Sequence, residues 1–316
     1  MGLVSLLYRR LYVHRYDDEG WLKYLTAEDF PGLKADPVSF DSDGNTLRGF
    51  FYSYPDCRQD ALIVFCHGIG GGHLSYTSEI AAICRAGYPV LAYDNTGCFS
   101  SDGKDIGCLS RSLADLDHAI RYLKAEGIFQ KYAHVYVIGH SWGGFAAGNI
   151  SLYHEDIRKI VVISGFLSVE SILSGQLDSM KIPLRGLIVS RIKAFERAHA
   201  PEYCAADMTD AVRRGTAEYF LAQSEDDAMV SFPRNIGRLK ELFPDQSYLI
   251  CSGRGHNPNY TRDAVDYMRS VFGAFERNKK QYATPEQKKA YFADTDWHRI
   301  TAQDPDFWSQ VFAFLG

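Results

Sequence analysis

The chain has 316 residues, of which 46% are hydrophobic and 23% are charged, and its formal net charge is −5. This length fits one large domain, or a domain with an insertion, and a chain of this size can bury a large core without disulfide bonds. The mild acidity argues against nucleic acid as the main partner, because binding to phosphates requires a basic surface.

The seven cysteines form no C-x-x-C pair. This argues against a zinc cluster or a disulfide framework and favours a reducing compartment. We therefore expect a cytoplasmic protein that uses neither a metal ion nor an organic cofactor.

Residues 1–37 are expected to form an N-terminal helical segment. The apolar run at positions 3–7 is too short for the core of a signal peptide, and arginines follow it rather than precede it. We expect a short helix packed on the body of the protein. The alternative is an interfacial anchor with Arg9, Arg10 and Arg15 at lipid headgroups. No stretch approaches the roughly 20 apolar residues that span a bilayer.

Short β-rich runs then alternate with helical segments. Residues 38–55 are predicted to form a hairpin that turns at Asp43-Gly44. The other predicted strands are nearly continuous apolar runs at 61–68, 89–94, 134–139, 159–165, 218–224 and 247–253, and helices are predicted at 76–86, 110–127, from about 142, and at 235–242. Strands without polar alternation, separated by helices, are typical of a parallel sheet covered on both faces. We therefore predict an α/β fold with a mostly parallel central sheet of about eight strands flanked by helices.

The interval 166–213 is too long for one crossover helix and contains many large apolar side chains. We interpret it as a helical cap inserted into a core made of residues 38–165 and 214–316. The alternative is a pair of ordinary packed helices that shape no pocket. The polar stretch 276–303 separates a predicted helix at 262–275 from a last one at 307–315.

The motif with most chemical content is Gly139-His140-Ser141-Trp142-Gly143, which lies between a predicted strand and a predicted helix. G-x-S-x-G in this context indicates a nucleophile elbow, a tight turn that exposes the serine hydroxyl above the carboxyl edge of the sheet. The glycines are needed because a side chain at either position would collide with the neighbouring strand or helix. We predict Ser141 as the nucleophile and expect His140 to pack beneath the elbow.

A glycine-rich turn follows His67-Gly68 at the end of the predicted strand 61–68. It suits one half of an oxyanion hole, with the backbone N–H of Ile69 and that of Trp142 as the two donors. The alternative is a glycine-rich loop without chemistry; a phosphate loop is disfavoured because no Gly-Lys-Ser/Thr follows. We expect the His67 ring to bond to the loop backbone.

A predicted strand ends near position 223, and three acidic residues follow it. Asp227 has the spacing expected of a triad acid, with Asp226 as the fallback. His256 lies in the loop after the last predicted strand and is the candidate base. The order Ser141, Asp227, His256 is the one expected of this sheet architecture.

With these motifs the sequence resembles the α/β-hydrolase superfamily, and within it capped bacterial esterases, monoacylglycerol-lipase-like hydrolases and their peptidase-like relatives. The loop 92–103 is similar to the family's D-x-x-G-x-G-x-S loop; it matches at Asp94, Gly97 and Ser101, but Phe99 replaces the second glycine. That loop borders the pocket in relatives. The resemblance thus implies an α/β-hydrolase fold, and we predict Phe99, Phe166 and His73 as substrate-binding residues, with a surface position as the alternative for His73.

The expected function is that of a serine hydrolase acting on small carboxylic esters with a hydrophobic acyl or alkyl group, through an acyl-enzyme. An amidase or peptidase with the same triad is one alternative, and a non-catalytic binding protein on a hydrolase scaffold is another. A cofactor-free haloperoxidase or a C–C bond hydrolase can reuse the same triad.

Overall fold

The computed structural model describes residues 3–180 and 185–316. The other six positions lie outside the described residues: residues 1–2 open the predicted N-terminal segment, and residues 181–184 fall within the predicted cap.

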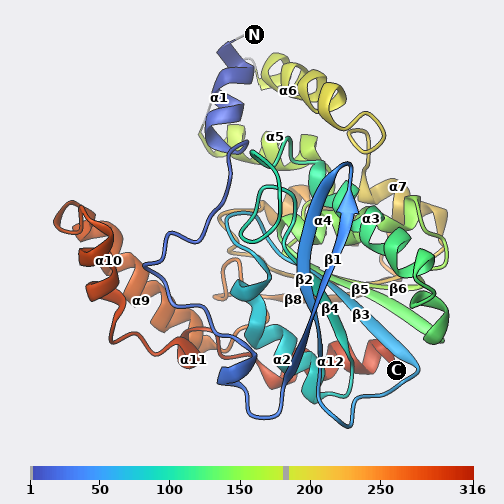
Figure 1. Cartoon of the computed structure of the whole chain (residues 1–316). Coiled ribbons are helices and arrows are strands. Elements are labelled where there is room, and N and C mark those ends of the chain that lie inside the picture. Colours follow the sequence, from blue (N-terminus) through green and yellow to red (C-terminus); the bar gives the residue numbers. More distant parts are fainter. Residues whose placement is uncertain (1–2, 181–184) are drawn as a thin grey trace.

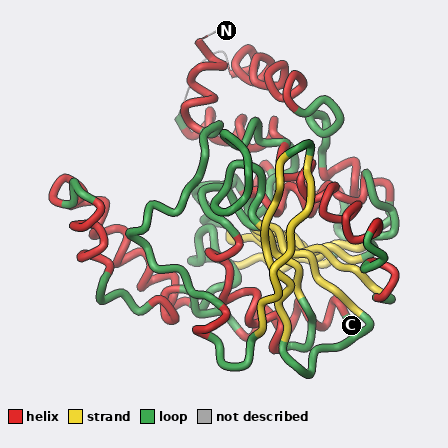
Figure 2. Tube along the Cα trace, viewed as in Figure 1, coloured by secondary structure: helices red, strands yellow, loops and turns green. Residues whose placement is uncertain are grey.

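Eight strands form one sheet at the centre of the molecule (Figures 1 and 2). Across the sheet they follow the order β1 (Lys34–Ser42), β2 (Asn45–Ser53), β4 (Val90–Tyr93), β3 (Ala61–Cys66), β5 (His134–His140), β6 (Lys159–Ile163), β7 (Glu218–Ser224) and β8 (Ser247–Cys251). The β1–β2 and β2–β4 pairs are antiparallel, and the other pairs are parallel. This confirms the prediction of a mostly parallel sheet of about eight strands.

The predicted hairpin is formed by β1 and β2. Its two turn residues, Asp43 and Gly44, have φ values of 51° and 80°. Two consecutive positive φ values give a turn whose twist matches that of the strands, which explains the Asp-Gly pair. β1 begins at Lys34, four residues earlier than predicted, because residues 34–37 pair with residues 50–53 of β2.

Both faces of the sheet are apolar. Consecutive residues of a strand point to opposite faces, so a continuous apolar run covers both of them. In β3, Leu62 and Val64 belong to one core cluster, whereas Ile63 and Phe65 belong to the other. The first cluster is closed by α3 (Arg111–Ala125), α4 (Trp142–Asn149) and α8 (Ile236–Leu242), and the second by α2 (Thr77–Arg85) and α12 (Pro305–Leu315). Burial on two faces accounts for the absence of polar alternation in the central strands.

The described part of the predicted cap is helical and consists of α5 (Val169–Ser179), α6 (Arg185–His199) and α7 (Met208–Arg214). The N-terminal helix α1 (Leu3–Leu11) lies against α6 (Figure 1), where the Tyr8 hydroxyl donates to the carboxylate of Glu196. Glu196 is fully buried and also accepts from the Leu109 N–H at 3.0 Å and the Ser110 hydroxyl at 2.6 Å. This carboxylate therefore joins the first and sixth helices to the start of α3. The division into cap and core stays a prediction.

Between α1 and β1 the chain is mostly loop, apart from a 3-10 turn at Ala27–Asp29, so the expected helical segment is helical mainly at its start. Tyr16 forms a bridge with Cys98, and the Trp21 ring stacks on Phe275, with centroids 5.8 Å apart. Figure 1 shows this stretch passing from the region of α6 to the C-terminal helices α9 (Arg262–Asn278), α10 (Pro285–Phe292) and α11 (Trp297–Ile300). Within the described residues, no helix combines the length and apolar character needed to cross a bilayer.

Candidate active site

Ser141 lies between β5 and α4 with φ 56° and ψ −114°, a backbone conformation that residues other than glycine rarely adopt. The flanking glycines are required by space. A Cβ atom on Gly139 would lie 2.1 Å from the Gly143 carbonyl oxygen, and one on Gly143 would lie 2.1 Å from the Cys66 oxygen. The turn from β5 into α4 thus leaves no room for a side chain at either glycine, as expected of a nucleophile elbow.

The predicted base and acid meet after β7 and β8. His256 Nδ1 lies 2.9 Å from Asp227 Oδ2, while Asp227 Oδ1 accepts from the backbone N–H groups of Met229 and Val230 at 2.9 and 3.0 Å. Burial by itself would raise the pKa of Asp227, but the hydrogen bond from His256 and the two amides lower it overall. Asp227 is therefore an ionised acceptor, and His256 Nδ1 carries the proton that it accepts.

Asp226, the fallback acid, makes no hydrogen bond to the imidazole among the described residues. It accepts from the Ser224 hydroxyl and from the N–H groups of Gly253 and Gly255, and it pairs with Arg269 at 3.2 Å. Its carboxylate thus fastens the loop that carries His256.

The other ring nitrogen of His256, Nε2, is buried and has no hydrogen-bond partner among the residues that the structure describes. Because Nδ1 donates to Asp227, Nε2 is the acceptor in the neutral ring. The rings of His140 and His256 lie 4.7 Å apart, so the loop of the base packs against the elbow. Ser141 is 7% exposed.

His140 links the elbow to both neighbouring loops. Its Nε2 donates to the carbonyl of His256 at 2.9 Å, and its Nδ1 accepts from the Tyr76 hydroxyl at 2.9 Å. The same hydroxyl accepts from the Gly68 N–H at 3.0 Å. Burial, and then the neighbouring His256, lower the pKa of His140 to about 3, so the ring stays neutral and keeps this pattern. The expectation that His140 packs beneath the elbow agrees with this position.

His67 fixes the peptide group that would supply one oxyanion donor. Its Nε2 accepts from the Asn95 N–H at 2.9 Å, so its Nδ1 is the donor to the Gly68 carbonyl at 2.8 Å. In a trans peptide the carbonyl and the following N–H point in opposite directions. The Ile69 N–H is therefore turned away from His67. The expected contact of the His67 ring with the loop backbone is present.

Trp142, the second predicted donor, is the first residue of α4. First-turn amides of a helix have no acceptor within the helix, so the Trp142 N–H is available above the elbow. Its side chain is fully buried and its indole N–H donates to the Leu109 carbonyl at 2.6 Å, which fixes the residue in place.

The three predicted substrate-binding side chains are not brought together. His73 and Phe99 line one cavity of about 930 Å³, whereas Phe166 is 4% exposed and stacks on Phe145 with centroids 4.9 Å apart. Sequence reasoning missed Tyr76, because nothing in its position distinguishes it from the other tyrosines among a total of 20.

Comparison with known proteins gives one family match. The model of the alpha/beta hydrolase family matches residues 63–312. Epoxide hydrolase B of Mycobacterium tuberculosis is 28% identical over 117 residues, which are 36% of this chain and 30% of that protein. A proline iminopeptidase of Saccharolobus solfataricus is 32% identical over 111 residues, 34% of each chain. The matched segments thus span about a third of these curated relatives.

Among the solved structures with a similar fold, two illustrate how low the sequence identity is. An esterase of Pyrococcus furiosus has a TM-score of 0.59 at 16% identity, covering 89% of this chain and 97% of its own. Est1E of Butyrivibrio proteoclasticus, solved with ferulic acid bound, has a TM-score of 0.54 at 16% identity, covering 77% and 99%. At this identity the likeness concerns the fold.

Proposed function

The chain belongs to the alpha/beta hydrolase family, and on that premise we propose that it is a serine hydrolase that cleaves carboxylic esters through Ser141, His256 and Asp227. Hydrolase activity itself is supported by the family match and by the esterase and epoxide hydrolase relatives. The choice of residues and of bond rests on the geometry of the site.

In the proposed reaction His256 Nε2 takes the proton of Ser141 Oγ as that oxygen bonds to the ester carbonyl carbon. The carbonyl oxygen becomes an oxyanion that accepts from the N–H groups of Ile69 and Trp142. Collapse breaks the bond to the alcohol oxygen, which receives the proton from His256. Water then repeats the sequence on the acyl-enzyme, and the acid leaves with Ser141 restored.

The observation that carries this proposal is the contact of 2.9 Å between His256 Nδ1 and Asp227, which leaves a buried Nε2 without a partner within the described residues. The same ring packs against His140, the residue next to the strained serine. An ionised Asp227 stabilises the imidazolium that forms when Ser141 loses its proton. The proposed reaction requires Nε2 of His256 to be unprotonated when Ser141 attacks.

A serine nucleophile favours acyl substrates over epoxides. Attack of Ser141 on an epoxide carbon would leave an alkyl ether of the serine oxygen, which water does not cleave at neutral pH. Attack on an ester leaves an acyl group on the same oxygen, and water removes it. Amides are the second candidate, favoured by the segment shared with the proline iminopeptidase. The leaving amine must also be protonated, a task that the same His256 can perform.

A fluorophosphonate probe followed by ester hydrolysis tests the proposal. We expect the protein to be labelled and the Ser141→Ala variant to be neither labelled nor active, with a loss of turnover of roughly 10⁴–10⁶-fold. Ser164→Ala is the matched control, since Ser164 also has a positive φ (49°) and follows the adjacent strand β6. Labelling that survives in Ser141→Ala would refute the assignment, and an unlabelled wild-type protein would favour a non-catalytic binding protein.

The substrate class is tested with p-nitrophenyl esters of increasing acyl length and with aminoacyl arylamides. We propose a hydrophobic acyl or alkyl group because the predicted cap, residues 166–213, is rich in large apolar residues. A clear preference for acetate would contradict this, and faster turnover of the arylamides would favour the amidase. We also propose a reducing, cytoplasmic location; the seven cysteines, all within the described residues, are free thiols.

A further inference from the structure

A cavity of about 930 Å³ lies at the β1–β2 edge of the sheet. Its walls come from four places: the N-terminal stretch (Asp17, Asp18), the hairpin (residues 37–39 and 48–50), the 3-10 turn His73–Tyr76 and the loop after β4. No residue of the triad is among the described residues that line it. The cavity is therefore separate from the proposed catalytic groups.

A buried carboxylate–imidazole pair forms part of its wall. Asp94 accepts four hydrogen bonds: from the backbone N–H and Nδ1 of His73 at 2.8 and 2.7 Å, and from the N–H and hydroxyl of Ser100 at 3.1 and 2.6 Å. Burial alone would raise the pKa of Asp94, but its interactions with His73, with His67 and with the Ser100 side chain lower it to about 2. Asp94 is thus a carboxylate, and His73 Nδ1 carries a proton.

The second nitrogen of this imidazole, Nε2, makes no hydrogen bond within the described residues. His73 is 2% exposed, and its Nε2 has no hydrogen-bond partner within residues 3–180 and 185–316. With Nδ1 donating to Asp94, Nε2 of the neutral ring is a lone-pair acceptor. Buried polar atoms are normally paired, so an unpaired acceptor in the wall of a cavity points to a ligand that brings a hydrogen-bond donor.

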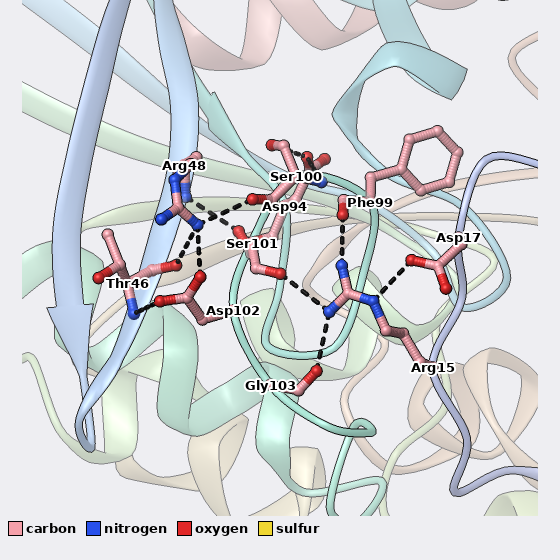
Figure 3. Close-up of polar contacts among 10 residues, drawn as sticks. All are labelled: Arg15, Asp17, Thr46, Arg48, Asp94, Phe99, Ser100, Ser101, Asp102 and Gly103. Atoms are coloured by element: carbon pink, nitrogen blue, oxygen red, sulfur yellow. Dashed lines mark hydrogen bonds and ion pairs between the residues drawn. The ribbon is translucent and has the colours of Figure 1, made fainter.

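Two arginines hold the loop wall in a fixed shape (Figure 3). Arg15 donates to the carbonyls of Phe99, Ser101 and Gly103, and Arg48 donates to the Ser100 carbonyl and to Asp102. Phe99 has φ 40°, in the left-handed region that favours glycine, and its N–H donates to the Tyr16 carbonyl at 2.8 Å. The cavity is therefore preformed, with the Phe99 and Phe50 rings as apolar surfaces.

The charge left uncompensated around the cavity is negative. Arg15 is paired with Asp17 at 2.6 Å, and Arg48 is paired with Asp102 at 2.7 Å, so these four charges cancel. Neither Asp18 nor Asp94 has a lysine or arginine partner in the described part of the chain. A cation is the complementary ligand, and the two phenylalanine faces favour it further.

We propose that this cavity is a second ligand site, which binds a small amine with an apolar group. The ammonium group donates to His73 Nε2 under the negative charge of Asp94 and Asp18, and the apolar group lies on Phe50 and Phe99. In this proposal His73 and Phe99 belong to the second site rather than to the substrate pocket. It does not depend on the proposed hydrolase activity.

The test compares benzylamine, benzyl alcohol and benzoate, which share a ring and differ in charge. Each is titrated into protein labelled with ¹⁵N-histidine, with the His73 resonance assigned from the His73→Asn variant. We expect benzylamine to shift the His73 signal, to leave His256 unchanged, and to bind at least about tenfold more tightly than benzyl alcohol, the factor that one charge-assisted hydrogen bond supplies. Benzoate should not bind.

Two variants separate the site from general surface binding. His73→Asn retains a side-chain N–H for Asp94 but has no counterpart of Nε2, and Asp18→Asn changes only an exposed carboxylate. Both should weaken benzylamine binding, whereas Asp245→Asn, an exposed carboxylate elsewhere, should not. Equal affinity for the three probes, insensitivity to both variants, or a shift of His256 in place of His73 would overturn the proposal.

Discussion

The neutral His140 beneath the elbow predicts a specific loss of stability in acid. The folded protein holds this imidazole with a pKa of about 3, because burial disfavours its charged form. In the unfolded chain the same ring titrates near 6.5. Below that value the unfolded state takes up a proton that the folded state does not bind, so the unfolding free energy falls as the pH drops from about 6.5 toward 3.

The size of the effect follows from these two values. Between pH 7.5 and pH 5.0, His140 should reduce the unfolding free energy by about 2 kcal/mol, since one unit of difference in pKa corresponds to about 1.4 kcal/mol. In His140→Gln the side chain can still donate to the His256 carbonyl and accept from the Tyr76 hydroxyl, but it cannot titrate. The variant should be less stable than the wild type at pH 7.5 and should lose about 2 kcal/mol less on acidification.

Urea denaturation followed by circular dichroism at both pH values measures this difference. His134→Gln is the matched control, because it removes an exposed imidazole at the start of the same strand, β5. Contributions from other buried groups, such as His67, cancel between wild type and variant. If His140→Gln loses as much stability between the two pH values as the wild type does, the neutral buried imidazole is not the cause and the reasoning is wrong.

Three further substitutions probe single contacts. Tyr76→Phe removes the acceptor of the Gly68 N–H and should cost about 1–3 kcal/mol, measured as a lower Tm, and should reduce kcat if the adjacent peptide is an oxyanion donor. Gly143→Ala places a methyl group 2.1 Å from the Cys66 oxygen, and the protein should not fold to a soluble, labelled form. Glu196→Gln weakens charge-assisted bonds and should cost about 2–3 kcal/mol, with faster proteolysis of α1 and α6.

Each of these changes has a matched control. Tyr132→Phe alters a half-buried tyrosine before β5, and Glu170→Gln alters an exposed carboxylate of α5; both should change stability by less than about 1 kcal/mol. Gly186→Ala adds a methyl group in open space on α6 and should be neutral or slightly stabilising. A control that behaves like its partner would show that the named contact is not responsible.

The sequence by itself determined the features that depend on near neighbours in the chain. The apolar runs predicted the sheet strands, because a strand buried on both faces must be apolar throughout. The spacing of Gly139 and Gly143 around Ser141 predicted the elbow, because the turn leaves no room for a Cβ atom at either position. Ser141, Asp227 and His256 could be grouped as one candidate site because each follows a predicted strand, and parallel strands end at the same edge of the sheet.

The tertiary structure decided what depends on contacts between distant segments. The hydrogen bonds from Arg15 to a loop 84–88 residues away and from His140 to the carbonyl of His256, 116 residues away, have no local pattern that could indicate them. Phe99 shows the difference: its replacement of a glycine was visible in the sequence, but its hydrogen bonds to Tyr16 and Arg15 of the N-terminal stretch were not. Local spacing fixes backbone shape, whereas the partner of a buried polar atom is chosen only when the folded chain brings one within reach.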